Sequence, residues 1–156
     1  MNFKTLIFIC AFIAYTYALT LKQFNYQMIC LVNKERAKKK LPYLAYSKQL
    51  AQAALDHSKY QAKKKTMTHN ESGKYSTPMK RIKKTGFNPK ACAENVAYNQ
   101  KTMQQVMKAW MNSSGHKKNI LNKGYTHFGA GMKNRYWTQN FATSKSGRPK
   151  NVPKCP

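Results

Sequence analysis

The sequence predicts one α+β domain. Several segments repeat apolar residues at the helical spacing, two later segments alternate in the β manner, and no linker or internal repeat divides the chain. With 156 residues, 42% of them hydrophobic, the chain can bury one core of its own. The composition therefore argues against a wholly disordered basic polypeptide.

Two amphipathic helices are expected first. From Leu21, apolar residues fall on one helical face as far as the basic run KERAKKK, and Pro42 ends this element. Ser47 is a suitable N-cap for a second helix, which ends at the lysines of residues 63–65. The second helix therefore has an apolar face and a basic end.

Two further helices follow. Thr77 before Pro78 predicts a short helix, MKRIKK, that ends at Gly86. Thr102 and Gln105 form a capping-box pattern ahead of the clearest helical stripe in the chain. The stripe consists of Met103, Val106, Met107, Trp110 and Met111. We assign it to core packing rather than to a ligand surface.

A β-hairpin and an irregular tail complete the domain. HFGAGM and RYWTQNFA alternate in the β manner around a turn at Lys133 and Asn134. The glycines of the first strand allow a neighbouring element to approach closely. From Ser144 the chain is rich in proline, glycine and lysine, so the tail is expected to be irregular and held only if Cys155 is bonded.

The first 18 residues have the features of a secretory signal. Lys4 precedes an apolar run from Leu6 to Ala14, and small residues, Thr16 and Ala18, stand where signal peptidase cleaves. A membrane anchor is the alternative, but the run is shorter than the about 20 residues that a spanning helix needs. We therefore expect a secreted, extracellular protein with a signal peptide at 1–18, a domain at 19–143 and a basic tail at 144–156.

The charge is strongly one-sided, with 29 Lys and Arg against 4 Asp and Glu, a formal net charge of +25. Most positive charges must face water, where they repel one another. Anionic lipids or acidic surface polymers are the expected partners of a monomer. Specific nucleic-acid binding is not expected, because no RNA-binding signature appears and the chain carries a secretory signal.

Cys30, Cys92 and Cys155 remain after the signal, in a compartment that permits disulfides, so one bridge and one free thiol are expected. A bridge between Cys30 and Cys155 would close the longest loop and gain about 4 to 5 kcal/mol by the chain-entropy argument. The spacing does not exclude a bridge between Cys30 and Cys92.

The candidate site residues are His69, His116 and Glu94. Both histidines lie in a loop or at a helix start, where functional residues are common. With Glu94 they would supply two imidazoles and a carboxylate, a sufficient set for zinc with an open fourth position. The alternative is that these histidines lie on the surface or only make hydrogen bonds. This alternative is favoured more strongly for His57 and His127. A buried Glu94 would need a partner, so a structural role for it competes with catalysis.

Other motifs provide weaker evidence about function. GxSxG, HExxH and P-loop patterns are absent. Ser113 and Ser114 are more typical of a helix N-cap than of a nucleophile. Asn70 and Asn112 stand in Asn-x-Ser sequons and could carry glycans, and a glycan on Asn70 would crowd the adjacent His69.

The segments AENVAY, AWMNSSGHKKNIL, HFGAGM and YWTQNFA, in this order, resemble the CAP superfamily, also called SCP domains. This group comprises cysteine-rich secretory proteins, antigen 5 and pathogenesis-related 1 proteins. The segment CLVNKERAKKKLPYLAYSKQLAQAALDHS is similar to the first two helices of that domain, so the resemblance covers residues 22–143. It implies a three-layer α-β-α sandwich. Similarity to the tail of short fungal-type members also favours a bridge between Cys30 and Cys155.

The cleft of this family carries two histidines and two glutamates, associated with zinc or other divalent cations. By resemblance, His69, Glu94 and His116 match three members of this tetrad. Ser113 stands where many members have the second glutamate. This departure weakens any mechanism that uses two carboxylates.

The activities in the family include sterol and fatty-acid binding or export, antimicrobial action and roles at host surfaces. The aromatic loop linked to sterol binding is replaced here by KKNILNKGYTHFG. The leading expectation is a non-enzymatic secreted domain with a divalent-metal cleft and a cationic surface that binds anionic cell-surface material or lipid. The alternatives are a metal-assisted hydrolase in which Glu94 moves protons, and a membrane-active antimicrobial protein.

Overall fold

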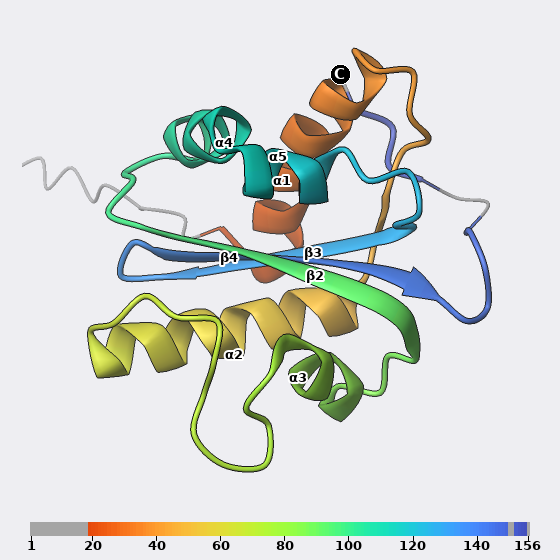
Figure 1. The fold of residues 1–156 in the computed structure, drawn as a ribbon. Helices are drawn as coiled ribbons and strands as arrows, with labels where there is room; N and C mark the ends of the chain where they lie inside the picture. Colours follow the sequence, from red (N-terminus) through yellow and green to blue (C-terminus); the bar gives the residue numbers. More distant parts are fainter. Residues whose placement is uncertain (1–18, 150–151, 156) are drawn as a thin grey trace, which may run out of the picture.

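The computed structural model describes residues 19–149 and 152–155, so the predicted signal peptide lies outside the described residues. A four-stranded sheet with the order β1-β3-β4-β2 forms the middle of the molecule (Figure 1). The strands are β1 (Ala45–Tyr46), β2 (Pro89–Tyr98), β3 (His127–Lys133) and β4 (Tyr136–Ser144). β1 pairs with β3 in parallel, and the other neighbours are antiparallel.

Helices cover both faces of the sheet (Figure 1). On one face lie α1 (Leu21–Ala37), α4 (Met103–Asn112) and α5 (Ser114–Ile120), and on the other lie α2 (Lys48–Lys64) and α3 (Pro78–Lys84). This arrangement confirms the predicted α+β class and the three-layer sandwich. The larger core lies between the sheet and the α1, α4 and α5 layer, and the stripe residues Val106, Met107 and Trp110 are buried in it, as expected.

The predicted N-caps are confirmed. The side chains of Ser47, Thr77 and Thr102 each accept a hydrogen bond from the backbone of the first helical turn. A complete capping box is found instead at the start of α1, where the side chains of Thr20 and Gln23 bond to each other's backbone N–H. At α4, the Gln105 side chain accepts from the backbone N–H of Lys101 at 2.8 Å, one residue before the cap.

The predicted hairpin is confirmed, with its turn shifted by one residue. Lys133 pairs with Tyr136 in the strand ladder. The two loop residues are Asn134 and Arg135, which have φ values of 48° and 62°. Two successive positive φ angles give the twist that a two-residue hairpin loop needs.

Glycine in β3 lets α2 approach the sheet closely, as the sequence predicted. A Cβ atom added at Gly129 would lie 2.1 Å from the backbone nitrogen of Ala51. A Cβ atom at Gly131 would lie 2.3 Å from the backbone nitrogen of Leu55. Only glycine therefore fits at these two positions without moving α2.

β2 is the main element that the sequence did not predict. It pairs with β4 along almost its whole length, from Pro89 opposite Ser144 to Tyr98 opposite Tyr136. Its central residues are covered on both faces by helices, so buried residues follow one another from Glu94 to Ala97 instead of alternating. A strand buried on both faces loses the period-two pattern by which exposed strands are recognised.

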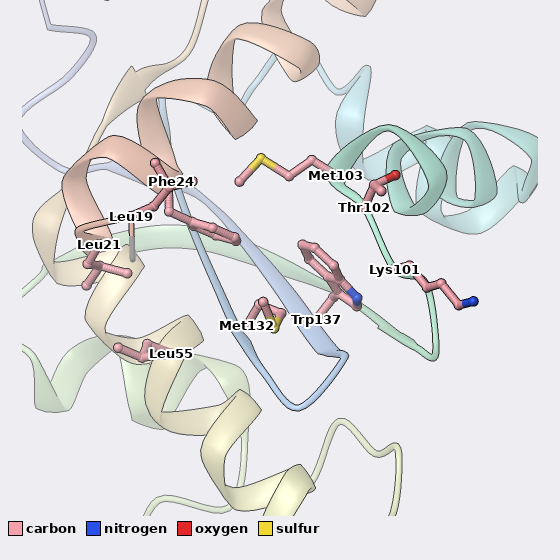
Figure 2. Close-up of a pocket in the computed structure, with 9 residues that line it drawn as sticks. All are labelled: Leu19, Leu21, Phe24, Leu55, Lys101, Thr102, Met103, Met132 and Trp137. Carbon is pink, nitrogen blue, oxygen red and sulfur yellow. The ribbon is translucent and has the colours of Figure 1, made fainter. Parts of the chain in front are cut away.

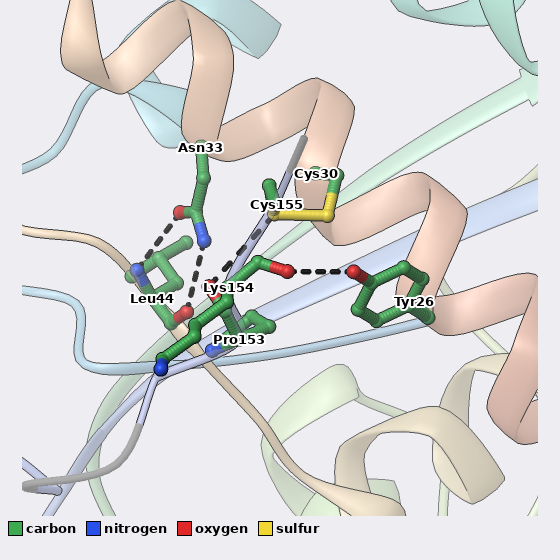
Figure 3. The surroundings of a disulfide bond; sticks show 7 residues. All are labelled: Tyr26, Cys30, Asn33, Leu44, Pro153, Lys154 and Cys155. Carbon is green, nitrogen blue, oxygen red and sulfur yellow. Dashed lines mark hydrogen bonds between the residues drawn. A yellow bond between two sulfur atoms is a disulfide. The ribbon is translucent and has the colours of Figure 1, made fainter.

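The C-terminal tail is attached to α1 by a disulfide between Cys30 and Cys155, which confirms the predicted pairing (Figure 3). The hydroxyl of Tyr26 also donates to the carbonyl of Lys154 at 2.6 Å. Cys92 is the free thiol, and burial raises its pKa. In the part of the chain that the structure describes, no helix has the length and apolar character needed to cross a bilayer.

Candidate functional site

Glu94 is the centre of a buried charge cluster on β2. Its side chain is 1% exposed and points toward the layer of α2 and α3. Nδ1 of His69 donates to Oε1 of Glu94 at 3.0 Å, and Nη2 of Arg81 donates to Oε2 at 2.7 Å. The partner that a buried carboxylate requires is therefore mainly Arg81, a residue that the sequence analysis did not single out.

Arg81, on the buried side of α3, also holds the loop before that helix. Nη2 donates to the carbonyl of His69 at 3.0 Å, and Nη1 donates to the carbonyl of Ser76 at 3.2 Å. Nε lies 3.5 Å from Oε1 of Glu71, an ion pair without hydrogen-bond geometry. One guanidinium thus neutralises two carboxylates and fixes the loop that carries His69.

His57, in α2, is the remaining member of the cluster. Its side chain is fully buried, with Nδ1 2.7 Å from Oε1 of Glu71 and Nε2 2.7 Å from the carbonyl of Thr68. Both ring nitrogens are therefore engaged within the cluster. His57 is therefore a hydrogen-bonding residue, as the sequence analysis expected.

The scarcity of acids was the signal that could have revealed this cluster. Only four carboxylate side chains exist in the chain. A buried Glu94 requires a cationic partner, and the chain offers 29 basic side chains that could be that partner. The identity of that cation, Arg81, depends on how α3 packs on β2 and could not be read from the spacing.

His116 lies on α5, near the β2 edge of the sheet. Burial lowers the pKa of His116, and the charge of His69 lowers it further. His69 is more open, with half of its side chain exposed. Of the three predicted site residues, the structure brings His69 and Glu94 into direct contact at 3.0 Å. His116 is linked to β2 through Asn95, the residue after Glu94.

Asn95 positions the backbone of His116. It follows Glu94 on β2 and so points to the opposite face of the sheet. Its amide donates to the carbonyl of His116 at 3.2 Å, and its oxygen accepts from the amide of Asn119 at 2.8 Å. Two adjacent residues of β2 thus hold the two histidines: Glu94 contacts His69, and Asn95 contacts α5, which carries His116.

Ser113 lies between α4 and α5. It is at once the C-cap of α4 and the N-cap of α5, with extended backbone at φ −96° and ψ 123°. Its side chain makes no capping hydrogen bond. Its position as the altered member of the tetrad stays a prediction.

A three-ligand metal centre is not formed by the side chains as they stand. Within residues 19–149 and 152–155, no three His, Cys, Asp or Glu side chains are arranged to hold a metal ion. Both oxygens of Glu94 are engaged, one by His69 and one by Arg81.

The two sequon asparagines, Asn70 and Asn112, are both exposed. Asn70 directly follows His69, so a glycan there would stand beside that histidine. Glycosylation at either residue stays a prediction.

The chain matches the cysteine-rich secretory protein (CAP) family over residues 30–143. It is 39% identical over 117 residues to an uncharacterized protein of Bacillus subtilis, YkwD, covering 74% of this chain and 45% of that protein. It is 34% identical over 115 residues to an uncharacterized membrane protein of the same organism, YlbC, covering 74% of this chain and 33% of that protein. The chain thus spans less than half the length of these two relatives.

Solved structures show the same fold. An extracellular SCP-domain protein from Bacillus anthracis superimposes with a TM-score of 0.72 at 31% identity, over 80% of this chain and 44% of that one. An outer surface protein from Borrelia burgdorferi superimposes with a TM-score of 0.65 at 26% identity, over 77% of this chain and 90% of that one. By the family match and by the fold, the chain belongs to the cysteine-rich secretory protein, or CAP, family.

Proposed function

We propose that this CAP domain acts outside the cell as a non-enzymatic binding domain, whose cationic surface attaches it to anionic cell-surface material. The observation that carries the proposal is that every acidic side chain already has a basic partner. Glu71 and Glu94 are in the Arg81 cluster. Glu35 lies 2.6 Å from Lys38, and Asp56 lies 4.0 Å from Lys59. Most of the 29 basic side chains therefore have no acid within the molecule to neutralise them.

The proposed location has three supports. The solved structures from Bacillus anthracis and Borrelia burgdorferi are described as those of an extracellular and an outer surface protein. The disulfide between Cys30 and Cys155 is of the kind that persists in oxidising compartments. The first 18 residues have the features of a secretory signal.

Binding to dextran sulfate tests the adhesion, with uncharged dextran as the matched control. We expect retention on the sulfated polymer alone, and a steep loss of affinity as salt is raised, because an ionic interaction across solvent is screened over about 8 Å at physiological ionic strength. Equal retention on both polymers, or retention that ignores salt, would contradict the proposal.

A second function, divalent-metal binding in the cleft, is favoured by the hydrogen bond from His69 to Glu94. That bond fixes the proton on Nδ1 of His69 and leaves Nε2 as the lone-pair nitrogen. His116, with its pKa lowered by burial, adds a second neutral imidazole. In this arrangement Glu94 orients a ligand instead of serving as one. The metal, when bound, would supply a positive centre to which an anionic ligand could attach.

Hydrolysis through Glu94 receives less support from the geometry. A general base needs an oxygen free to accept a proton from a bound water. Oε1 already accepts from His69, and Oε2 accepts from Arg81. These contacts favour a positioning role for the carboxylate.

A further inference from the structure

We propose that one end of this domain docks on the surface of an anionic lipid bilayer. This docking end consists of the chain before and at the start of α1 (residues 19–22), the loop from β2 to α4 (residues 99–102) and the tip of the β3–β4 hairpin (residues 132–135). The inference rests on the adhesion to anionic material proposed above, and it names the partner and the face.

Apolar side chains, two of them exposed, surround a cavity at this end. Its volume is about 480 Å³, and its lining includes Leu19, Leu21, Phe24, Leu55, Met132 and Trp137 (Figure 2). Leu19 is 48% exposed and Met132 is 36% exposed. In Figure 2 these side chains come from α1, from α2 and from the hairpin and converge on one space. An exposed apolar site on so charged a protein points to an apolar partner.

Four cations lie on the same three segments. Lys22, Lys101, Lys133 and Arg135 are all exposed, and Lys101 also lines the cavity. No acidic residue belongs to these segments. Positive charge alone would not select a face of this molecule, because lysines are spread over every helix. The combination of exposed apolar side chains and cations selects this end, and it is the combination that binds anionic membrane surfaces.

Aromatic residues add to the match. Tyr98 is 48% exposed and stacks on Tyr136 with ring centroids 4.2 Å apart. Nε1 of Trp137 donates to the carbonyl of Gln100 at 2.9 Å, which fixes the indole beside the cavity. Tyrosine and tryptophan are the residues that favour the boundary between lipid headgroups and acyl chains.

A polysaccharide would neutralise the lysines equally well, but it has no apolar phase for Leu19 and Met132 to enter. A bilayer therefore fits both properties of this end.

Sedimentation with vesicles tests the proposal. The vesicles contain phosphatidylcholine with about one third phosphatidylglycerol, and the comparison vesicles contain phosphatidylcholine alone. The end variant replaces Lys101, Lys133 and Arg135 with glutamine. The matched control replaces Lys38, Lys39 and Lys40, at the far end of α1, and so changes the net charge equally. We expect about a fivefold weaker partition for each cation removed from the docking end, and a much smaller effect of the control.

A second variant separates the apolar contribution to vesicle binding from the electrostatic contribution. Leu19→Ser with Met132→Ser changes two exposed side chains, so folding is retained, which circular dichroism verifies. We expect weaker binding to the anionic vesicles and unchanged binding to dextran sulfate. Vesicles with brominated acyl chains should quench the tryptophan fluorescence of the unaltered protein, because Trp137 lines the cavity at the docking end. Binding without quenching would overturn the proposed orientation.

The remaining outcomes each decide a different question. If the end variant and its control weaken vesicle binding equally, and the serine variant has no effect, charge acts diffusely and the docking end is rejected. If dextran sulfate is bound and vesicles are not, the partner is a polymer; the adhesion stands and the lipid inference fails. If neither is bound, both proposals fail.

Discussion

Nη2 of Arg81 lies 2.7 Å from Oε2 of Glu94, and both side chains are almost completely buried. The pair joins α3 to β2, and the same guanidinium bonds to the carbonyl of His69. The position of His69 and the packing of α3 on β2 therefore both depend on one cation.

Removing that cation should be costly. We expect Arg81→Met to lower the free energy of unfolding by about 3 to 5 kcal/mol, because Glu94 would be left buried and unpaired. The double variant with Glu94→Gln should recover part of this loss. Urea unfolding measures both. Lys38→Met, which breaks an exposed pair with Glu35, is the comparison and should cost less than about 1 kcal/mol. Similar losses for the two single variants would show that Glu94 does not depend on Arg81.

The imidazoles of His69 and His116 lead to a prediction about the binding of a divalent metal. Calorimetric titration with Zn²⁺ at about pH 7.5, where a neutral imidazole is available as a ligand, should show binding that disappears in the variant with His69→Ala and His116→Ala. Glu94→Gln keeps an acceptor for His69 and should weaken binding by about 10- to 100-fold, the usual effect of losing an orienting partner. His127→Ala is the control. Zn²⁺ binding that persists without His69 and His116 would place the metal elsewhere.

The close approach of α2 to β3 predicts a steric effect. Gly131→Ala places a Cβ atom 2.3 Å from the backbone nitrogen of Leu55, so α2 must shift. We expect a loss of at least about 2 kcal/mol in the free energy of unfolding, comparable with overpacking of a core. Gly115 in α5 has no atom within 4 Å of an added Cβ. Gly115→Ala should therefore stabilise the protein by up to about 1 kcal/mol. Thermal unfolding distinguishes the two, and a neutral Gly131→Ala would contradict the packing argument.

His127 predicts part of the pH dependence. Burial, and then the charge of Arg148, lowers the pKa of His127 below its ordinary value of 6.5. On acidification the unfolded chain takes up this proton before the folded chain does, so stability is complete above 6.5 and declines below it. His127→Gln should make the unfolding free energy less sensitive between about pH 7.5 and pH 5. An unchanged slope would mean that His127 titrates alike in both states.

The disulfide predicts a large dependence on redox conditions. Replacing Cys30 and Cys155 with serine should lower the free energy of unfolding by about 4 kcal/mol, because the bridge closes a loop of more than one hundred residues in the unfolded chain. A reducing agent should have the same effect on the unaltered protein. Cys92→Ser is the control and should leave the effect of the reducing agent unchanged. If reduction does not alter stability, the unfolded chain is not constrained by this bridge.

Local sequence patterns were sufficient to predict the helices and strands that have one exposed face. The caps of α2, α3 and α4 follow from Ser47, Thr77 and Thr102, whose side chains act within one turn. β3 and β4 were recognisable by alternation and by a turn. β2 was missed because helices cover both of its faces, and β1 was missed because two residues cannot show a period.

The site was predictable in part, for a related reason. His69, Glu94 and His116 stand out by residue type and by resemblance to the family. Arg81 and Glu71 do not, because each acts through a contact between elements distant in the sequence. An ion pair of this kind has no local signature, so only the packing of α3 on β2 reveals it.

Asn95 and Ser113 together determine how α5 is held. Asn95 joins α5 to β2 at two points, through the carbonyl of His116 and the amide of Asn119. Nε1 of Trp110 joins α4 to the same strand through the carbonyl of Val96. Ser113 separates the two helices with extended backbone, and its side chain makes no capping hydrogen bond. Loss of the two Asn95 contacts would therefore release α5 and leave α4 in place.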